Sequence, residues 1–107
     1  TSDGFVTVAR VGEIAVDAVK VVYVDGVAVA VFRLADGYYA IEDVCTHDGG
    51  QLTGGCIDGG EIICPRHGAR FSLRTGDALT APAYEPTAAF PVRIENGIVY
   101  TRDPRWD

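Results

Sequence analysis

Two short stretches of the sequence hold residues that could bind a metal. The first is Cys45-Thr46-His47, and the second, after sixteen intervening residues, is Cys64-Pro65-Arg66-His67. Each stretch supplies one thiol and one imidazole, and together they use both histidines of the chain. A lone Cys or His is most often an ordinary buried residue. Four of them gathered in this way favour a metal site whose candidate ligands are Cys45, His47, Cys64 and His67.

Zinc is one metal that this set could bind, because it accepts two thiolates and two imidazoles in a tetrahedron. Structural zinc sites, however, usually pair cysteine with cysteine and histidine with histidine, at spacings unlike Cys-x-His. They also stabilise domains too small to fold without metal, whereas 48% of this chain is hydrophobic, enough to form a core. A zinc-stabilised binding module therefore stands as a rival hypothesis.

The sequence between the two stretches predicts a loop that wraps closely around a bound group. Six of the chain's 13 glycines lie there, at positions 49, 50, 54, 55, 59 and 60. Glycine tolerates backbone conformations that other residues avoid, so this segment can make tight, irregular turns. The remaining cysteine, Cys56, lies in the same segment and is expected to fill space within it.

The rest of the chain predicts antiparallel strands. Short runs of β-branched and aromatic residues alternate with turn signals, and Asp25-Gly26, Asp36-Gly37 and Asn96-Gly97 each predict a hairpin turn. The expected strands cover residues 5–11, 20–24, 27–34, 38–42, 90–94 and 98–102. This pattern predicts an all-β fold, an antiparallel β sandwich or small barrel.

Length and charge narrow the classes of function. The 107 residues fit a single domain, and the net charge of −6 argues against binding to nucleic acid or to an anionic membrane surface. No apolar run approaches the roughly 20 residues that span a bilayer, and the first residues lack a secretory pattern. We therefore expect a soluble, cytoplasmic protein. Four acidic residues near the two stretches could face a basic partner: Asp43, Asp48, Asp58 and Glu61.

The segments CTHDGG and CPRHGARFSLRTG resemble the small Rieske-type ferredoxins of bacterial aromatic-ring dioxygenase systems, and the similarity continues through PAYEPTAAFPVRIENG. The resemblance implies one [2Fe–2S] cluster, with Cys45 and Cys64 on one iron and His47 and His67 on the other. It also implies a Rieske-type β sandwich or barrel forming a single domain, 1–107. A small cluster-binding subdomain, about 43–75, would be inserted between hairpins.

The implied function is electron transfer without catalytic residues. A flavin-containing ferredoxin reductase would supply single electrons, and a Rieske non-heme iron terminal oxygenase would receive them. Two imidazoles in place of two thiolates remove negative charge, which raises the reduction potential, and complete ligation leaves no iron position open for substrate. A subunit of another oxidoreductase, such as the small subunit of nitrite reductase, is the alternative within this class.

The sequence departs from the pattern of the high-potential Rieske proteins of respiratory complexes, and these departures affect the reduction potential that we expect. Gly50 and Arg66 stand where that branch has two further cysteines, and Ala69 and Phe71 stand where it has hydroxyl donors to the cluster. With fewer hydrogen-bond donors to the cluster, its reduced state is less stabilised, so we expect a reduction potential below about 0 mV.

Two further segments have alternative interpretations. Leu52 either forms part of an exposed docking face or packs inward and seals the cluster from water. Residues 81–86 either cover the cluster or serve only as a rigid connector.

Overall fold

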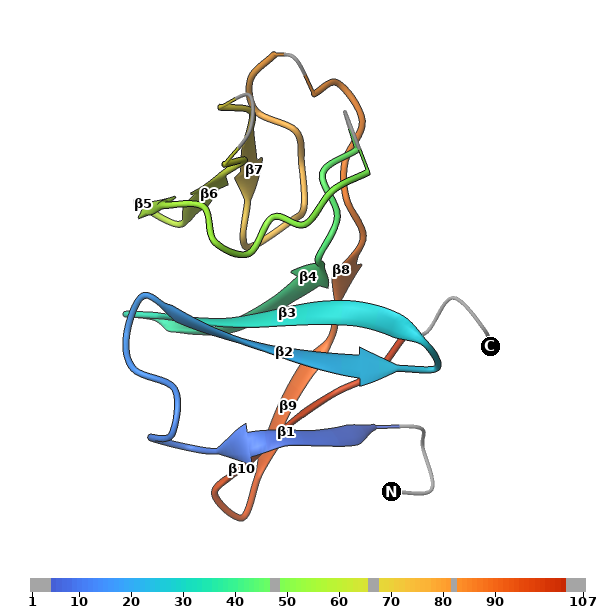
Figure 1. Cartoon of the computed structure of the whole chain (residues 1–107). Helices are drawn as coiled ribbons and strands as arrows, with labels where there is room; N and C mark the ends of the chain where they lie inside the picture. Colours follow the sequence, from blue (N-terminus) through green and yellow to red (C-terminus); the bar gives the residue numbers. More distant parts are fainter. Residues whose placement is uncertain (1–4, 47–48, 66–67, 82, 104–107) are drawn as a thin grey trace.

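The computed structural model describes residues 5–46, 49–65, 68–81 and 83–103, which form strands and connecting loops (Figure 1). The strands, in chain order, are β1 (Val6–Arg10), β2 (Ala18–Val24), β3 (Val27–Leu34), β4 (Gly37–Glu42), β5 (Ile57–Asp58), β6 (Glu61–Ile63), β7 (Arg70–Ser72), β8 (Ala89–Phe90), β9 (Val92–Glu95) and β10 (Ile98–Thr101). Within these residues there is no helix of the length and hydropathy needed to cross a membrane.

Three antiparallel sheets are arranged as layers. The middle sheet has the order β2-β3-β4-β8, and the sheet β1-β10-β9 lies on one side of it, at the bottom of Figure 1. The small sheet β5-β6-β7 lies on the other side, at the top. The predicted all-β antiparallel class is confirmed.

Strand β3 is buried on both faces, which explains its continuous apolar sequence VAVAVFRL. Successive side chains of a strand point to opposite faces. Val29 and Val31 accordingly belong to the core between the two large sheets, which also contains Val8, Phe90 and Val99. The alternate residues of β3 belong to a second core under the small sheet, whose buried members are Ala30, Phe32, Leu34, Ile41, Cys45, Leu52, Ile62, Cys64, Ala69, Phe71, Leu73 and Ala83. We call this second set the upper core.

Two of the three predicted hairpin turns are confirmed, and one is shifted. Asp25-Gly26 and Asn96-Gly97 are two-residue turns in which all four residues have positive φ, as a type I′ turn requires. In the third hairpin Leu34 pairs with Gly37, so the turn is Ala35-Asp36 and Gly37 begins β4. The prediction of an Asp36-Gly37 turn is wrong by one residue because β4 begins at Gly37, one residue earlier than predicted, where it pairs with Leu34 at the buried end of β3.

The strand predicted at 90–94 is two strands in two different sheets. β8 pairs with β4, whereas β9 pairs with β10, and Pro91 separates them. Proline has no N–H to donate to a strand ladder, so the chain changes sheets at this position. The Pro91 carbonyl accepts a hydrogen bond from Thr101 Oγ1 (2.9 Å), which holds the crossing in place.

An arginine joins the small sheet to the middle sheet. The Arg74 guanidinium follows β7 and contacts the Asp36 carboxylate (3.1 Å) in the turn between β3 and β4, and it stacks over the Tyr39 ring. It also lies against Gly60, where a Cβ atom would collide with it. The hydrogen bond from Arg74 is the main reason that the pKa of Asp36 lies below its usual value.

Candidate metal centre

Cys45 begins a tight loop that follows β4. Its N–H donates to the Gly50 carbonyl (2.7 Å), and its own carbonyl accepts from the Gly49 N–H (2.7 Å). Gly49 has φ +75, a conformation that strongly favours glycine. We call residues 45–50 the first cysteine loop.

Cys64 begins a second loop with the same backbone pattern, between β6 and β7. Its N–H donates to the Ala69 carbonyl (2.7 Å), its carbonyl accepts from the Gly68 N–H (3.0 Å), and Gly68 has φ +76. The second cysteine loop, residues 64–69, therefore repeats at corresponding positions the two backbone hydrogen bonds and the positive-φ glycine of the first loop. The predicted ligands His47 and His67 fall inside the two loops but outside the described residues, as do Asp48 and Arg66.

Both cysteines are buried in the upper core, with exposed fractions of 0% for Cys45 and 1% for Cys64. Two loops distant in sequence thus bring two cysteine side chains into one apolar cluster, which fits a pair of thiolate ligands for iron. The residues described include no third metal-binding side chain beside them. The assignment of all four ligands therefore stays a prediction.

The buried carboxylate of Asp43, which precedes the first cysteine loop, is hydrogen-bonded to the residues that follow the loop. Its Oδ1 accepts from the N–H groups of Leu52 and Thr53 (2.9 Å each), and its Oδ2 accepts from Thr53 Oγ1 (2.8 Å). Asp43 is 5% exposed. The expectation that it faces a basic partner is wrong, because its carboxylate is buried and accepts three hydrogen bonds from Leu52 and Thr53.

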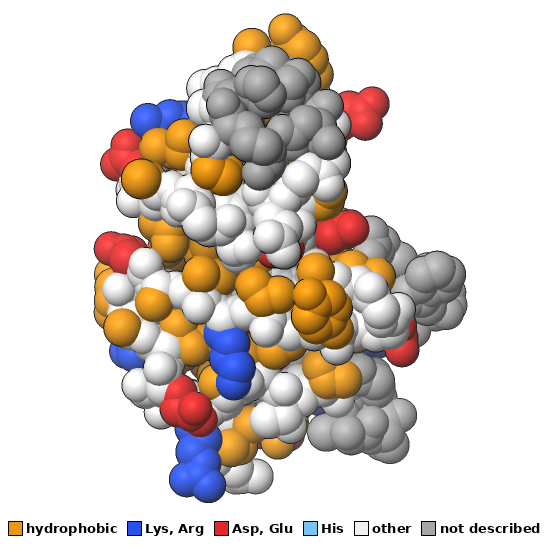
Figure 2. All heavy atoms as spheres, in the orientation of Figure 1, with side chains coloured by type: hydrophobic (Ala, Val, Ile, Leu, Met, Phe, Trp, Pro, Cys, Tyr) orange, Lys and Arg blue, Asp and Glu red, His pale blue; other side chains and the backbone are white. Residues whose placement is uncertain are grey.

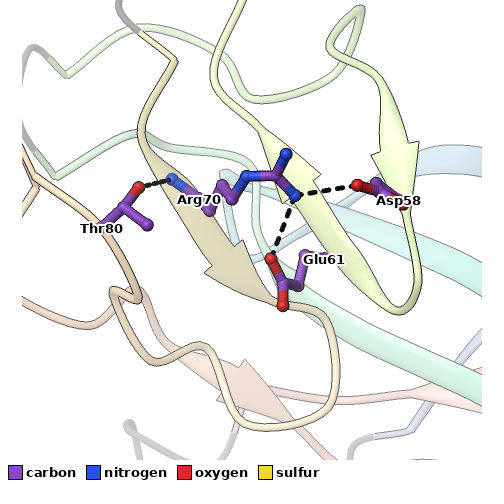
Figure 3. Close-up of polar contacts among 4 residues, drawn as sticks. All are labelled: Asp58, Glu61, Arg70 and Thr80. Carbon is purple, nitrogen blue, oxygen red and sulfur yellow. Dashed lines mark hydrogen bonds and ion pairs between the residues drawn. The ribbon is translucent and has the colours of Figure 1, made fainter.

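Arg70 fixes the far end of the second cysteine loop (Figure 3). Its guanidinium contacts Asp58 (3.1 Å) and Glu61 (3.3 Å), which face each other on β5 and β6. Its backbone N–H donates to Thr80 Oγ1 (2.9 Å), and its carbonyl accepts from the Leu79 N–H (2.8 Å). These two acidic residues are therefore neutralised within the chain. The hydrogen bond to Asp58 is the largest cause that raises the pKa of Arg70 above its usual value.

The segment 81–86 is tied to both the cysteines and the first cysteine loop. Ala83 is buried in the upper core with Cys45 and Cys64. The Thr46 hydroxyl, next to Cys45, donates to the Glu85 carbonyl (2.6 Å). These contacts favour a cover over the cysteine cluster rather than a mere connector; Pro82 lies outside the described residues.

The structure settles the other expectations about this region. Leu52 is completely buried in the upper core, so it seals the site and is not part of a docking face. Cys56 is exposed, so the expectation that it fills space is wrong. The close packing in this segment is at Gly55 instead: a Cβ atom there would lie 1.9 Å from the Ile63 carbonyl oxygen, so only glycine allows the two backbone segments to approach so closely. Sequence analysis gave no role to Thr46 or Arg70, because the residues that they contact lie nine to 39 positions away along the chain.

Comparison with known proteins identifies the family. The Rieske [2Fe–2S] domain family matches residues 4–91. Ferredoxin CarAc of Metapseudomonas resinovorans is 42% identical over 71 residues, which span 66% of each chain. The ferredoxin component of the naphthalene 1,2-dioxygenase system of Pseudomonas putida is 39% identical over 75 residues, 70% of this chain and 72% of that one.

Comparison with solved structures supports the same family assignment. The ferredoxin of carbazole 1,9a-dioxygenase from Nocardioides aromaticivorans IC177 has a TM-score of 0.87 at 31% identity, covering 92% of this chain and 96% of that one. A ferredoxin solved as a complex of reduced oxygenase and oxidized ferredoxin in carbazole 1,9a-dioxygenase also has a TM-score of 0.87, at 33% identity, with coverage of 92% and 93%. The chain belongs to the Rieske [2Fe–2S] family and is a ferredoxin of the kind found in bacterial aromatic-ring dioxygenase systems, an electron-carrying component.

Proposed function

We propose that Cys45 and Cys64 hold one iron of a [2Fe–2S] cluster and that His47 and His67 hold the other. The observation that carries this proposal is the repeated backbone hydrogen-bond pattern of the two cysteine loops, each of which begins with a buried cysteine and contains one histidine in its sequence. When bound, such a cluster accepts and releases one electron at a time.

The surrounding residues would control access of water to the cluster. Leu52, Ala69 and Phe71 are completely buried around the cysteines, so the thiolate side of the site is apolar. A dry, low-dielectric setting disfavours added negative charge and so tunes the potential. The cluster-binding subdomain proposed at about 43–75 contains both cysteine loops, and Ala83 adds a contact from outside these bounds.

The proposed partners are a flavin-containing ferredoxin reductase as electron donor and a Rieske non-heme iron terminal oxygenase as acceptor, in the cytoplasm. Support comes from the relatives, which include components of naphthalene and carbazole dioxygenase systems. One relative was solved in complex with its oxygenase.

Iron and acid-labile sulfide assays on the purified chain test the cofactor. We expect two irons and two sulfides per chain and the visible and EPR spectra of a Rieske centre. The variants Cys64→Ser and His67→Ala should lose these spectra, whereas Cys56→Ser, a matched control at the exposed third cysteine, should keep them. One equivalent of zinc without sulfide, or a native spectrum in either ligand variant, would refute the assignment.

Reconstitution tests the partners. The cluster-loaded chain is mixed with a flavin-containing ferredoxin reductase, NADH and a terminal oxygenase, and product formation is measured with and without the chain. Product that depends on the chain is the expected result. Obligate co-purification with the subunits of another oxidoreductase, without such activity, would instead support a permanently bound subunit.

A further inference from the structure

Strand β2 is an edge of the middle sheet, because it pairs only with β3. The backbone groups of successive residues in such a strand point alternately toward its neighbour and away from it. Val24 pairs with Val27 across the two-residue turn, which sets the alternation. The outward N–H and C=O groups therefore belong to Val19, Val21 and Tyr23, and no backbone group in the described part of the chain bonds to them.

The sequence of β2 favours pairing with another strand. Residues 19–24, VKVVYV, contain four valines and a tyrosine, with no proline, no glycine and one charge. Segments of this composition are the ones that pair with other chains when they lie at an exposed edge. Tyr23 is 69% exposed, and Figure 2 shows hydrophobic side chains and a basic one exposed together over the middle sheet.

Lys20 interrupts this apolar strand on the face that is turned toward a core. Its neighbours on that face, Ala18, Val22 and Val24, belong to the core between the two large sheets. Lys20 pairs with the completely buried Val31, yet its own side chain is exposed and forms no ion pair with a carboxylate of the described residues. A lysine on the core-facing row of an edge strand is one of the features by which proteins prevent edge-to-edge pairing.

The charge of Lys20 also lies where two copies of the chain would meet. Two β2 edges can pair antiparallel about a two-fold axis, and the longest overlap places Val21 opposite Val21 of the second copy. Lys20 is then opposite Val22 and diagonal to Lys20 of the second copy, while Asp17 is opposite Asp25. Moving the axis to Lys20 places the two ammonium groups directly opposite each other. Like charges at these positions destabilise a strand pair.

We propose that the β2 edge is a latent self-association surface of this chain and that Lys20 prevents it from pairing with the β2 edge of a second copy. The surface fits an antiparallel strand whose outward backbone groups match its own. The inference goes beyond the proposed function and depends on neither the cluster ligands nor the redox partners. Its benefit is that an electron carrier stays monomeric and free to move between a donor and an acceptor.

Sedimentation velocity of the cluster-loaded chain over a range of concentrations tests the inference. The wild type should be monomeric. Lys20→Val should self-associate at least about tenfold more tightly, because it removes the like-charge contact and adds a β-branched residue to the strand pair. The variant is also more negative overall, which by itself disfavours association. The matched control is Arg10→Val, which removes one exposed positive charge at the end of β1 and should stay monomeric.

Two further variants distinguish edge pairing from nonspecific association. Lys20→Glu alone should be monomeric, whereas its equimolar mixture with the wild type should associate, since only mixed pairs carry opposite charges at position 20. Lys20→Val combined with Tyr23→Pro should return to the monomer, because proline removes an outward N–H without loss of a bond to β3. Hydrogen exchange followed by NMR should show the Val19 and Val21 amides of Lys20→Val becoming protected as its concentration rises.

Several results would overturn the inference. They are a wild type that is already dimeric, a Lys20→Val variant that stays monomeric, and equal association of Lys20→Val and Arg10→Val. A Lys20→Val dimer whose Val19 and Val21 amides exchange as freely as in the monomer would also overturn it, and this measurement decides the matter if the double variant does not fold. The proposed function is judged separately, by iron, sulfide and product formation.

Discussion

The two cysteine loops share one backbone design but are anchored in opposite ways. In each loop the cysteine N–H donates to the carbonyl five residues on, and the cysteine carbonyl accepts from a glycine with positive φ four residues on. The first loop is closed by the buried carboxylate of Asp43, which accepts three hydrogen bonds. The second is fixed by Arg70, whose ion pairs lie at the surface. The same pattern of backbone hydrogen bonds is therefore supported by a buried anchor in one loop and by a solvent-exposed anchor, which salt can screen, in the other.

Removing the buried anchor should have the largest effect. Asp43→Ala leaves the N–H groups of Leu52 and Thr53 without their acceptor, and buried unsatisfied donors cost about 1–3 kcal/mol each. We expect the free energy of unfolding to fall by about 3 kcal/mol, measured by urea denaturation, and cluster occupancy to fall with it. Thr53→Val, which removes only the hydroxyl contact, should cost about 1 kcal/mol. Equal losses for the two variants would contradict the role assigned to the carboxylate.

The shared backbone design is tested by two matched glycine substitutions. Gly49→Ala and Gly68→Ala place a Cβ in open space at nearly the same positive φ, so each should cost roughly 1–2 kcal/mol through backbone strain alone. Thermal unfolding of the cluster-loaded variants measures both losses. A cost at one glycine without a comparable cost at the other would show that the two loops are not equivalent.

A hydroxyl introduced into the second cysteine loop should shift the potential. Ala69 is completely buried, and its carbonyl accepts from the Cys64 N–H, so Ala69→Ser places a donor beside a predicted thiolate ligand. One added hydrogen bond of about 1 kcal/mol corresponds to roughly 40 mV for one electron. Protein-film voltammetry should give a wild-type potential below about 0 mV and a higher value for the variant. Ala81→Ser, an exposed control, should leave the potential unchanged.

Loss of the surface anchor should have the smallest effect on stability. Arg70→Gln removes ion pairs to Asp58 and Glu61 that contribute little to the free energy of unfolding, because these side chains are partly solvated. The difference from wild type should vanish in about 1 M salt, whereas the deficit of Asp43→Ala should persist. A deficit of Arg70→Gln that survives high salt would remove the proposed contrast between the two anchors.

Local patterns predicted most of the strands and two of the turns, because Asp-Gly and Asn-Gly between apolar runs specify their own geometry. The register at Gly37 and the change of sheet at Pro91 depend on which core each residue enters, and neighbouring residues do not reveal that.

The same limit applies to the site. Spacing identified Cys45 and Cys64 as candidates, and the structure brings both into the upper core. The partners of Asp43 and Thr46 lie nine and 39 residues away, so only the folded chain shows that one closes the first cysteine loop and the other holds the segment 81–86.

Burial of β3 on both faces has a consequence for how the chain opens. Its side chains stabilise the core between the large sheets and the upper core alternately, and its backbone pairs with β2 on one side and β4 on the other. The β3 amides should therefore exchange with deuterium only through global unfolding, while the amides of the short β5 and β6 exchange through smaller openings. The end of the molecule that carries the cysteines could then open to admit iron and sulfide while the lower sheets stay folded.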